Sequence, residues 1–417
     1  NNFYYVPGQS FQVPTSPEYK VLGGNESPLA DGFFDETPAK WTGNGARAPK
    51  PDINDWYETV KVNYGVKPDG SYDFVQLPSE YKNKDYRAHY AFWQDKELPN
   101  SWYKFRDIAL FWLDKGVDGF RYDMAEMVPV EFWSFLNSSI KMQKSDAFLL
   151  AEVYNPLMYR AYIHQGKMDY LYDKVGFYDT LKAIMQGKQA ANAIFAAQSQ
   201  VTDIEAHMLH FLENHDEQRI ASPDFAGNAR WGKPAMVVSS LISRAPTLLY
   251  FGQDVGEDGS ENAGFGTPTR TSIFDYIGVP AHQAWMNNGK FDGANLTQEQ
   301  VALRDYYKAI MSLNSLPAVV GGEMTELSVT GSERVVGFTR KLGQQALYVL
   351  SNFSEQPQTI TVNLSKVQLA VLSEHTQLHD LLEQHSTEIT SGSQGASFTL
   401  TLDAFSSAVL TNKANHE

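Results

Sequence analysis

The sequence predicts an α/β protein that carries a separate all-β region at its C-terminal end. From residue 101 to about 319, short apolar runs alternate with amphipathic segments, as in right-handed strand–helix–strand units that build a parallel sheet. After about residue 320 the apolar residues recur with period two, which is typical of antiparallel strands. Residues 1–100 show neither period.

The segment 1–100 is rich in Pro, Gly, Asn and aromatic residues, and we expect a loop-rich excursion there, because such long stretches in compact proteins are usually functional. Its aromatic rings can pack against the apolar faces of sugar rings, but ordinary packing explains any single one of them better. These aromatic residues are Tyr4, Tyr5, Trp41, Trp56, Tyr57, Trp93 and, just after the segment, Trp102.

The elements of the region 101–319 follow from their apolar spacing. A first helix is predicted from Phe105, Ile108, Ala109 and Trp112, which fall on one face, and Gly116 marks its end. Pro129 begins a second helix, whose apolar face is formed by Phe132, Phe135, Leu136 and Ile140. Buried strands are predicted at 117–122, 147–152, 168–172, 208–212 and 247–251.

The region 320–417 is predicted to form an antiparallel β-sandwich. Strands are expected at 335–338, 346–350, 359–362 and 398–402, with turn residues between them. The predicted domain boundaries are therefore 1–100, 101–319 and 320–417.

Composition excludes several classes of function. The net charge of −15 disfavours a nucleic-acid partner, because phosphate backbones bind basic surfaces. No run approaches the roughly 18 apolar residues of a membrane-spanning helix. The chain has no cysteine, which rules out disulfides, zinc–thiolate sites and a cysteine nucleophile.

Three motifs place carboxylates at the ends of predicted strands. Gly119-Phe120-Arg121-Tyr122-Asp123 ends the first strand, Glu152 ends the second, and Asn214-His215-Asp216 follows the fourth. Arg121 favours an ionised Asp123, which suits a nucleophile, whereas the apolar run before Glu152 favours a protonated acid. Cleavage of a glycosidic bond requires such a pair of carboxyl groups.

Each motif is weak when taken singly. A carboxylate at a strand end is more often a cap or part of a surface ion pair, and Asn-His-Asp alone is a polar loop in most sequences. Metal ligation is a third interpretation for Asp123, Glu152, His215 and Asp216, but no His-x-x-x-His pattern supports it. The three motifs in this order favour the catalytic interpretation strongly.

Together the motifs resemble those of the α-amylase family, glycoside hydrolase family 13. That family carries Gly-Phe-Arg-x-Asp on strand four, a Glu on strand five and Asn-His-Asp on strand seven. The segment 250–256 resembles the family's strand eight, with Asp254 where Glu is usual, and 402–410 resembles the closing strand of its C-terminal sandwich. The resemblance implies a (β/α)8 TIM barrel with domain B at 1–100, of which this chain holds strands four to eight.

The resemblance also implies roles for the motif residues. Asp123 would be the nucleophile, Glu152 the acid/base, and Asp216 the residue that binds and distorts the sugar. Arg121, His215 and Tyr154 would contact the substrate. The implied activity is retaining hydrolysis of α-1,4-glucosidic bonds in starch or maltooligosaccharides. A 4-α-glucanotransferase and a non-catalytic binding subunit of the same family stay open as alternatives.

Two departures from the family pattern affect the expected site. Glu126 and Met127 stand where many α-amylases carry Lys-His in contact with the leaving-group sugar, so we expect an altered product preference. The family's first motif, Asp-x-x-x-Asn-His, is absent. We therefore expect the natural protein to be longer, with its N-terminal part completing the barrel, because five strands alone leave two open edges.

In the family, the missing motif usually supplies an Asn ligand for a calcium ion. The resemblance therefore leaves a calcium ion possible, but this sequence lacks that ligand. Its weak candidate ligands are Asp52, Asp55 and the carbonyl of Met127. No organic cofactor is expected. The resemblance leaves the compartment open and favours a periplasmic or secreted protein over a cytoplasmic one.

Overall fold

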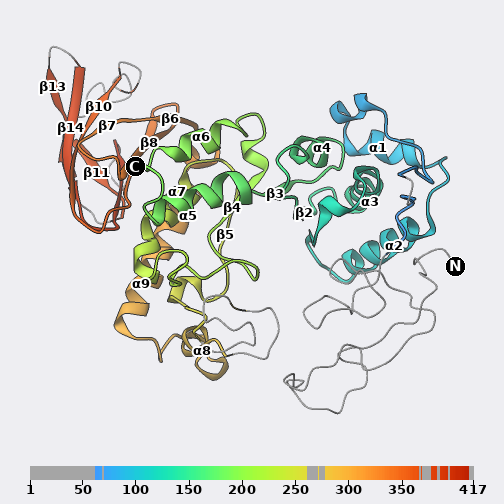
Figure 1. Cartoon of the computed structure of the whole chain (residues 1–417), viewed down its shortest axis with the longest axis horizontal. Coiled ribbons are helices and arrows are strands. Elements are labelled where there is room, and N and C mark those ends of the chain that lie inside the picture. Colours follow the sequence, from blue (N-terminus) through green and yellow to red (C-terminus); the bar gives the residue numbers. More distant parts are fainter. Residues whose placement is uncertain are drawn as a thin grey trace. The chain divides into compact units, whose positions relative to one another are not determined.

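The computed structural model describes residues 62–67, 70–260, 271, 278–365, 368, 377–382, 386–392 and 395–412 (Figure 1). The chain divides into two compact units, Asn1–Leu171 and Tyr172–Glu417. Each unit is described by itself.

The first unit combines helices with short parallel strands. In chain order its elements are η1 (Ser79–Asn83), α1 (Tyr86–Trp93), α2 (Asn100–Asp114), β1 (Gly119–Tyr122), η2 (Ala125–Met127), α3 (Val130–Gln143), β2 (Phe148–Ala151), α4 (Tyr159–His164) and β3 (Tyr170–Tyr172), which ends on the first residue of the second unit. β1 pairs with β2 and β2 with β3, both in parallel, with Arg121 opposite Leu150 and Leu150 opposite Tyr170. The predicted strands at 117–122, 147–152 and 168–172 are thereby confirmed.

Helix α3 follows the prediction closely. Pro129 stands at its N-cap, where a missing N–H is harmless. The predicted apolar face is buried, with each side chain at most 4% exposed: Phe132, Phe135, Leu136 and Ile140.

Helix α2 exists as predicted but buries a different face. Ala109 is buried, together with Trp102 and Leu113, whereas Ile108 and Trp112 are about half exposed. The helix begins at Asn100, earlier than the apolar spacing indicates, so Trp102 leads the buried side. Trp102 lies 5.6 Å from Trp93 between ring centroids, and both indoles are core residues, which confirms ordinary packing for these two.

A neutral hydrogen-bond chain lies in the core between α1 and α3. The Nε2 atom of His89 donates to the carbonyl of Tyr81 at 2.7 Å, so its Nδ1 atom accepts from the hydroxyl of Ser134, also at 2.7 Å. The Ser134 oxygen in turn accepts from the indole of Trp93 at 2.9 Å. Burial lowers the pKa of His89 to about 4, so the imidazole is uncharged at neutral pH.

The second unit begins with helices around two more parallel strands. Its elements up to the C-terminal sheets are η3 (Lys174–Tyr178), α5 (Asp179–Met185), α6 (Ala193–Ser199), η4 (Glu205–His207), β4 (Met208–Phe211), η5 (Ala229–Gly232), α7 (Lys233–Leu241), β5 (Thr247–Leu248), η6 (Gln253–Val255), α8 (Pro280–Met286), η7 (Asn287–Gly289), α9 (Gln298–Leu313) and α10 (Pro317–Val320). β4 pairs in parallel with β5, with His210 opposite Thr247. The strands predicted at 208–212 and 247–251 are confirmed, the latter in shortened form.

The C-terminal part of this unit consists of two antiparallel sheets (Figure 1). Its strands are β6 (Glu323–Glu326), β7 (Ser328–Thr330), β8 (Val335–Leu342), β9 (Gln345–Asn352), β10 (Gln358–Leu364), β11 (Gln377–Asp380), β12 (Ser386–Glu388), β13 (Thr390–Gly392), β14 (Gly395–Leu402) and β15 (Ser407–Thr411). One sheet has the order β13-β14-β10-β7, and the other has the order β12-β11-β15-β9-β8-β6.

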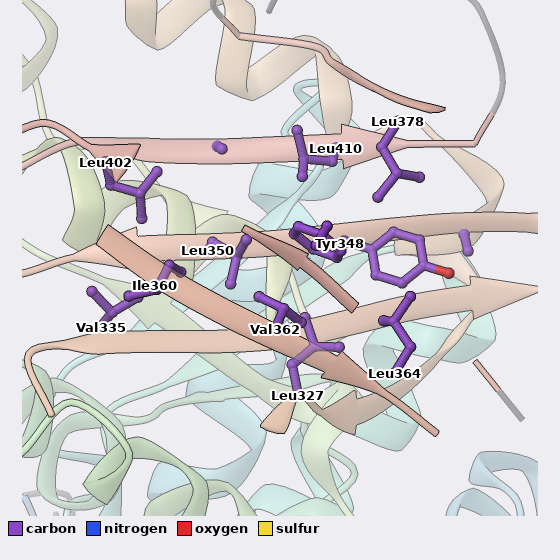
Figure 2. Packing of buried hydrophobic residues seen from close by; sticks show 13 residues of the cluster. Leu327, Val335, Tyr348, Leu350, Ile360, Val362, Leu364, Leu378, Leu402 and Leu410 are labelled. Carbon is purple, nitrogen blue, oxygen red and sulfur yellow. The ribbon is translucent and has the colours of Figure 1, made fainter. Parts of the chain in front are cut away.

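The two sheets pack face to face around one apolar core (Figure 2). Tyr348 and Leu350 from β9 meet Ile360 and Val362 from β10, and each of these side chains is at most 1% exposed. This arrangement follows from the period-two pattern, because alternate residues of a strand point to one face. The predicted sandwich is thereby confirmed.

Strand β9 is buried on both sides. Its alternate residues Leu347 and Val349 point away from the sandwich core and are also fully buried, and α7 packs against this strand. Arg340 on β8 donates to the carbonyl of Ile242 at 3.0 Å and to that of Val319 at 2.6 Å. Arg334 reaches the carbonyl of Ile184 at 2.7 Å. These guanidinium groups donate to carbonyls at the C-terminal ends of α5, α7 and α10, where a positive charge is favourable.

The fold prediction is confirmed in its class, with parallel strands alternating with helices before an antiparallel sandwich. The closed eight-stranded barrel stays a prediction. Most of the predicted excursion 1–100, including Tyr4, Tyr5, Trp41, Trp56 and Tyr57, lies outside the described residues, and the three domain boundaries stay predictions.

Candidate active site

Asp123 follows the last residue of β1, on the strand-end turn that the motif predicts. The strand can lie close to its neighbour because it begins with Gly119, where an added Cβ would meet the carbonyl oxygen of Phe148 at 1.9 Å. The Asp123 side chain is 68% exposed, and its Oδ1 atom accepts from Nη1 of Arg121 at 2.5 Å. The carboxylate is therefore both accessible and held in orientation by a cation.

Glu152 follows β2, directly beside this turn. Its backbone N–H donates to the carbonyl of Tyr122 at 3.0 Å, which extends the parallel pairing by one bond. The residue is 8% exposed. Its Oε2 atom lies 3.2 Å from Nη2 of Arg121 and accepts from the backbone N–H of Met124 at 2.9 Å. The sequence predicts an apolar setting for this carboxyl group, and the structure instead gives one of its oxygens two polar partners.

One guanidinium group thus contacts both carboxylates, Nη1 of Arg121 on Asp123 and Nη2 on Glu152. Met124, between them in the chain, has a φ of 44°, which is uncommon for a residue with a side chain. The backbone N–H of Met124 donates the hydrogen bond that Oε2 of Glu152 accepts. Backbone outliers of this kind persist where the surroundings impose them, and they gather at functional sites.

Glu126 ties this turn to the segment after Glu152. Its Oε2 atom accepts from the backbone N–H groups of Tyr154 and Asn155, both at 2.9 Å. The hydroxyl of Tyr162 donates to the carbonyls of Glu126 and Val128 at 3.1 and 2.7 Å. Glu126 therefore acts as a clamp between two loops, a use that the sequence analysis did not foresee.

The remaining predicted residues of this unit lie on the clamped loops. Met127 is 55% exposed beside Glu126, and Tyr154 is half buried. Beside Arg121 on β1, the structure therefore places five predicted residues on two adjoining loops of the first unit: Asp123, Glu126, Met127, Glu152 and Tyr154.

Asp216 belongs to the second unit, in the loop after β4. The Asn214 side chain accepts from the backbone N–H groups of Asp216 and Glu217, both at 2.8 Å, which fixes a tight turn. The Nε2 atom of His215 lies 3.2 Å from Oδ2 of Asp216. Asn214 thus fixes the backbone of the loop, while the side chains of His215 and Asp216 contact each other.

A buried ion pair braces this loop, and sequence reasoning missed it. Arg219 is fully buried, and its Nη1 atom donates to Oε2 of Glu213 at 2.8 Å and to the carbonyl of Phe251 at 2.7 Å. Burial raises the pKa of Glu213, which the Arg219 charge opposes. A Glu directly before the motif and an Arg three residues after it are the only sequence signals, and neither indicates burial.

The described residues contain no group of three or more His, Asp or Glu side chains that could hold a metal ion. Asp52 and Asp55 lie outside the described residues, so the calcium ion stays a prediction. None of the helices within the described part of the chain has the length and apolar character needed to cross a membrane.

A family model described as "Alpha amylase, catalytic domain" matches residues 89–310, more than half of the chain. Alpha-amylase 3 of Dictyoglomus thermophilum is 21% identical over 342 residues, which cover 70% of this chain and 66% of that protein. Alpha-amylase MalA of Haloarcula japonica is 26% identical over 70% of this chain and 42% of its own length.

A maltosyltransferase, the alpha-1,4-glucan:maltose-1-phosphate maltosyltransferase of Cereibacter sphaeroides, is 33% identical over 99 residues, which are 24% of this chain and 16% of that enzyme. The chain thus spans less than two-thirds of these relatives. Among solved structures, AmyP in complex with maltose superposes with a TM-score of 0.60 at 18% identity, covering 85% of this chain and 73% of AmyP. That likeness extends the fold comparison to most of the chain.

Proposed function

Because this chain belongs to the α-amylase family, we propose that the protein is a retaining glycosidase that cleaves α-1,4-glucosidic bonds in starch or maltooligosaccharides. The observation that carries the proposal is the single Arg121 guanidinium group in contact with both Asp123 and Glu152. A shared guanidinium keeps the two carboxyl groups close, and retaining glycosidases need closely spaced carboxyl groups.

In the first chemical step, Asp123 attacks the anomeric carbon and forms an ester with the sugar, while Glu152 gives a proton to the departing glycosidic oxygen. We assign that proton to Oε1 of Glu152, since its Oε2 atom faces Arg121 and the Met124 N–H. In the second step Glu152 takes a proton from water, and the resulting hydroxide displaces Asp123 with a second inversion. The two inversions retain the anomeric configuration.

The role proposed for Asp216, binding and distorting the sugar, rests on its place in the Asn-His-Asp motif. The pair of His215 and Asp216 supports it, because an imidazole 3.2 Å from a carboxylate offers a donor and an acceptor to neighbouring sugar hydroxyls.

Glycosyl transfer is a second candidate function. The similarity to the maltosyltransferase over 99 residues favours it. The two reactions share the covalent intermediate and differ only in whether water or another sugar displaces Asp123.

Incubation with maltoheptaose, followed by separation of products by size, tests both candidates. Hydrolysis gives only shorter sugars, and transfer gives shorter and longer sugars together. Asp123→Asn should lower kcat by about 10⁴-fold, as removal of a nucleophile does. The matched control is Asp118→Asn, the same change at a 96% exposed side chain before β1, which should keep full activity.

Glu152→Gln is tested on maltosyl fluoride, because fluoride departs without a proton from the enzyme. Formation of the covalent intermediate should then persist in Glu152→Gln and be absent in Asp123→Asn. Unchanged turnover in Asp123→Asn would refute the assignment of Asp123 as the nucleophile and with it the proposed enzyme. Binding of maltoheptaose without turnover by the wild type would favour a binding subunit of the family.

A further inference from the structure

A continuous row of aromatic rings runs outward from the end of β5. It consists of Tyr250, Phe251, His282, Trp285 and Phe291, here called the aromatic row. Successive ring centroids lie 4.6, 5.2, 5.4 and 5.7 Å apart. Two of its rings are open to solvent, with Phe251 38% and Phe291 55% exposed.

Phe291 holds its exposed position through a strained backbone. Its φ of 54° lies in the left-handed region, where Gly or Asn would be expected. The loop imposes this conformation by hydrogen bonds from the N–H of Phe291 to the carbonyl of Met286 at 2.9 Å and from the N–H of Gly293 to that of Trp285 at 3.0 Å. The Phe291 ring packs against Trp285 on one side and is still 55% exposed, although Gly or Asn would fit the turn with less strain.

Buried groups fix the helix that carries the middle of the row. Oε2 of Glu257, which is 1% exposed, accepts from the N–H groups of Ala281 and His282 at the start of α8. Gly252 permits this close packing, since an added Cβ would meet Cβ of Glu257 at 2.9 Å and Cβ of His282 at 3.3 Å. Arg304 pairs with Asp254 and lies over the Trp285 ring at 4.7 Å. These contacts hold His282 and Trp285, the middle of the row, in place.

The inner end of the row adjoins the loop of Asp216. The Arg219 guanidinium lies 4.5 Å from the centre of the Tyr250 ring and 4.9 Å from that of Phe251, and the same group braces Glu213. The row thus begins at a proposed substrate-binding loop and ends at the exposed ring of Phe291.

We propose that the aromatic row is a binding track for an α-glucan chain, with Phe251 and Phe291 as the rings on which sugar units stack. Pyranose rings present apolar C–H faces to aromatic side chains, and each step of the row is comparable to the width of one such ring. This inference rests on the proposed function for the identity of the ligand, because its continuity with the Asp216 loop selects a glucan over a protein partner.

The test measures retardation of the full chain in native gels that contain amylopectin, relative to gels without polysaccharide. Phe291→Ala and Phe291→Leu should each weaken retardation about tenfold, and Phe291→Trp should preserve it. Phe111→Leu is the matched control, because this phenylalanine on α2 is similarly exposed at 51%, and it should bind like the wild type. In parallel, the ratio of kcat/KM on amylose to that on maltotriose should fall in Phe291→Ala.

Retardation that survives both Phe291→Ala and Phe291→Leu would overturn the track, and so would loss in Phe291→Ala that Phe291→Leu restores, since that would indicate apolar packing of the loop. Failure of the proposed function is seen separately. Absent turnover of maltoheptaose with retardation that still depends on Phe291 would refute the glycosidase and leave the track standing.

Discussion

The two units of the molecule hold their site carboxylates by different physical means. In the first unit, Glu126 and Glu152 accept backbone N–H groups of loop residues. The core between α1 and α3 contains the neutral chain of His89, Ser134 and Trp93. In the second unit, the Asp216 loop depends on the fully buried ion pair of Arg219 and Glu213.

The difference shows where substitutions should act on stability and where on activity. A buried charge whose partner is removed is strongly destabilising, because the remaining ion has no solvent. Replacing a carboxylate that accepts loop N–H groups near water should lower the free energy of unfolding less. We expect such a replacement to act mainly on activity, by changing the geometry of the site.

Breaking the ion pair should produce the largest effect. Arg219→Met leaves Glu213 buried without its cation and should lower the free energy of unfolding by about 3–5 kcal/mol. Chemical denaturation of the full chain measures this. Arg230→Met is the control, since Arg230 pairs with Glu299 on the surface and should change stability by no more than about 1 kcal/mol. Equal effects of the two substitutions would contradict the comparison.

Acidification should charge the neutral network of the first unit. The pKa of His89 is about 4 in the folded state and about 6.5 when unfolded, so its contribution to stability is complete above pH 6.5 and is lost as the pH falls toward 4. The loss amounts to roughly 3 kcal/mol. The difference between the urea midpoints at pH 7 and pH 4.5 should be smaller in His89→Gln than in the wild type. An unchanged difference in that variant would contradict the assignment of this pH dependence to His89.

Removing the loop clamp should have the smallest effect on folding and a visible one on catalysis. Glu126→Ala leaves the N–H groups of Tyr154 and Asn155 without their carboxylate and should lower kcat/KM about tenfold, while Glu126→Gln, which keeps an acceptor oxygen, should lose about threefold. Glu80→Ala, at an exposed carboxylate in η1, serves as the control. A fall in kcat/KM of the same size in Glu126→Gln and Glu126→Ala would indicate that the charge itself contacts the sugar.

Local patterns predicted the strands, the face of α3 and the positions of Asp123 and Glu152, because each depends on residues adjacent in the chain. The buried face of α2 could not be predicted this way, since Trp102 is selected by the aromatic core of Trp93, Phe132 and Phe135. The same holds for Glu126, whose partners are 28 and 29 residues away, and for Arg219, which also donates to Thr271, 52 residues away. Sequence showed these charges but not their burial or their partners.

The double-sided burial of β9 has a consequence for recombination within the family. A C-terminal region exchanged between relatives would bring a strand whose outer side must match the surface of α7, together with arginines that reach Ile184 and Ile242. Chimeras joined between α10 and β6 should therefore aggregate unless α7 is exchanged with the sheets. We expect β9 and α7 to be exchanged together among relatives. Leu347 and Val349 should covary with the α7 residues that cover them.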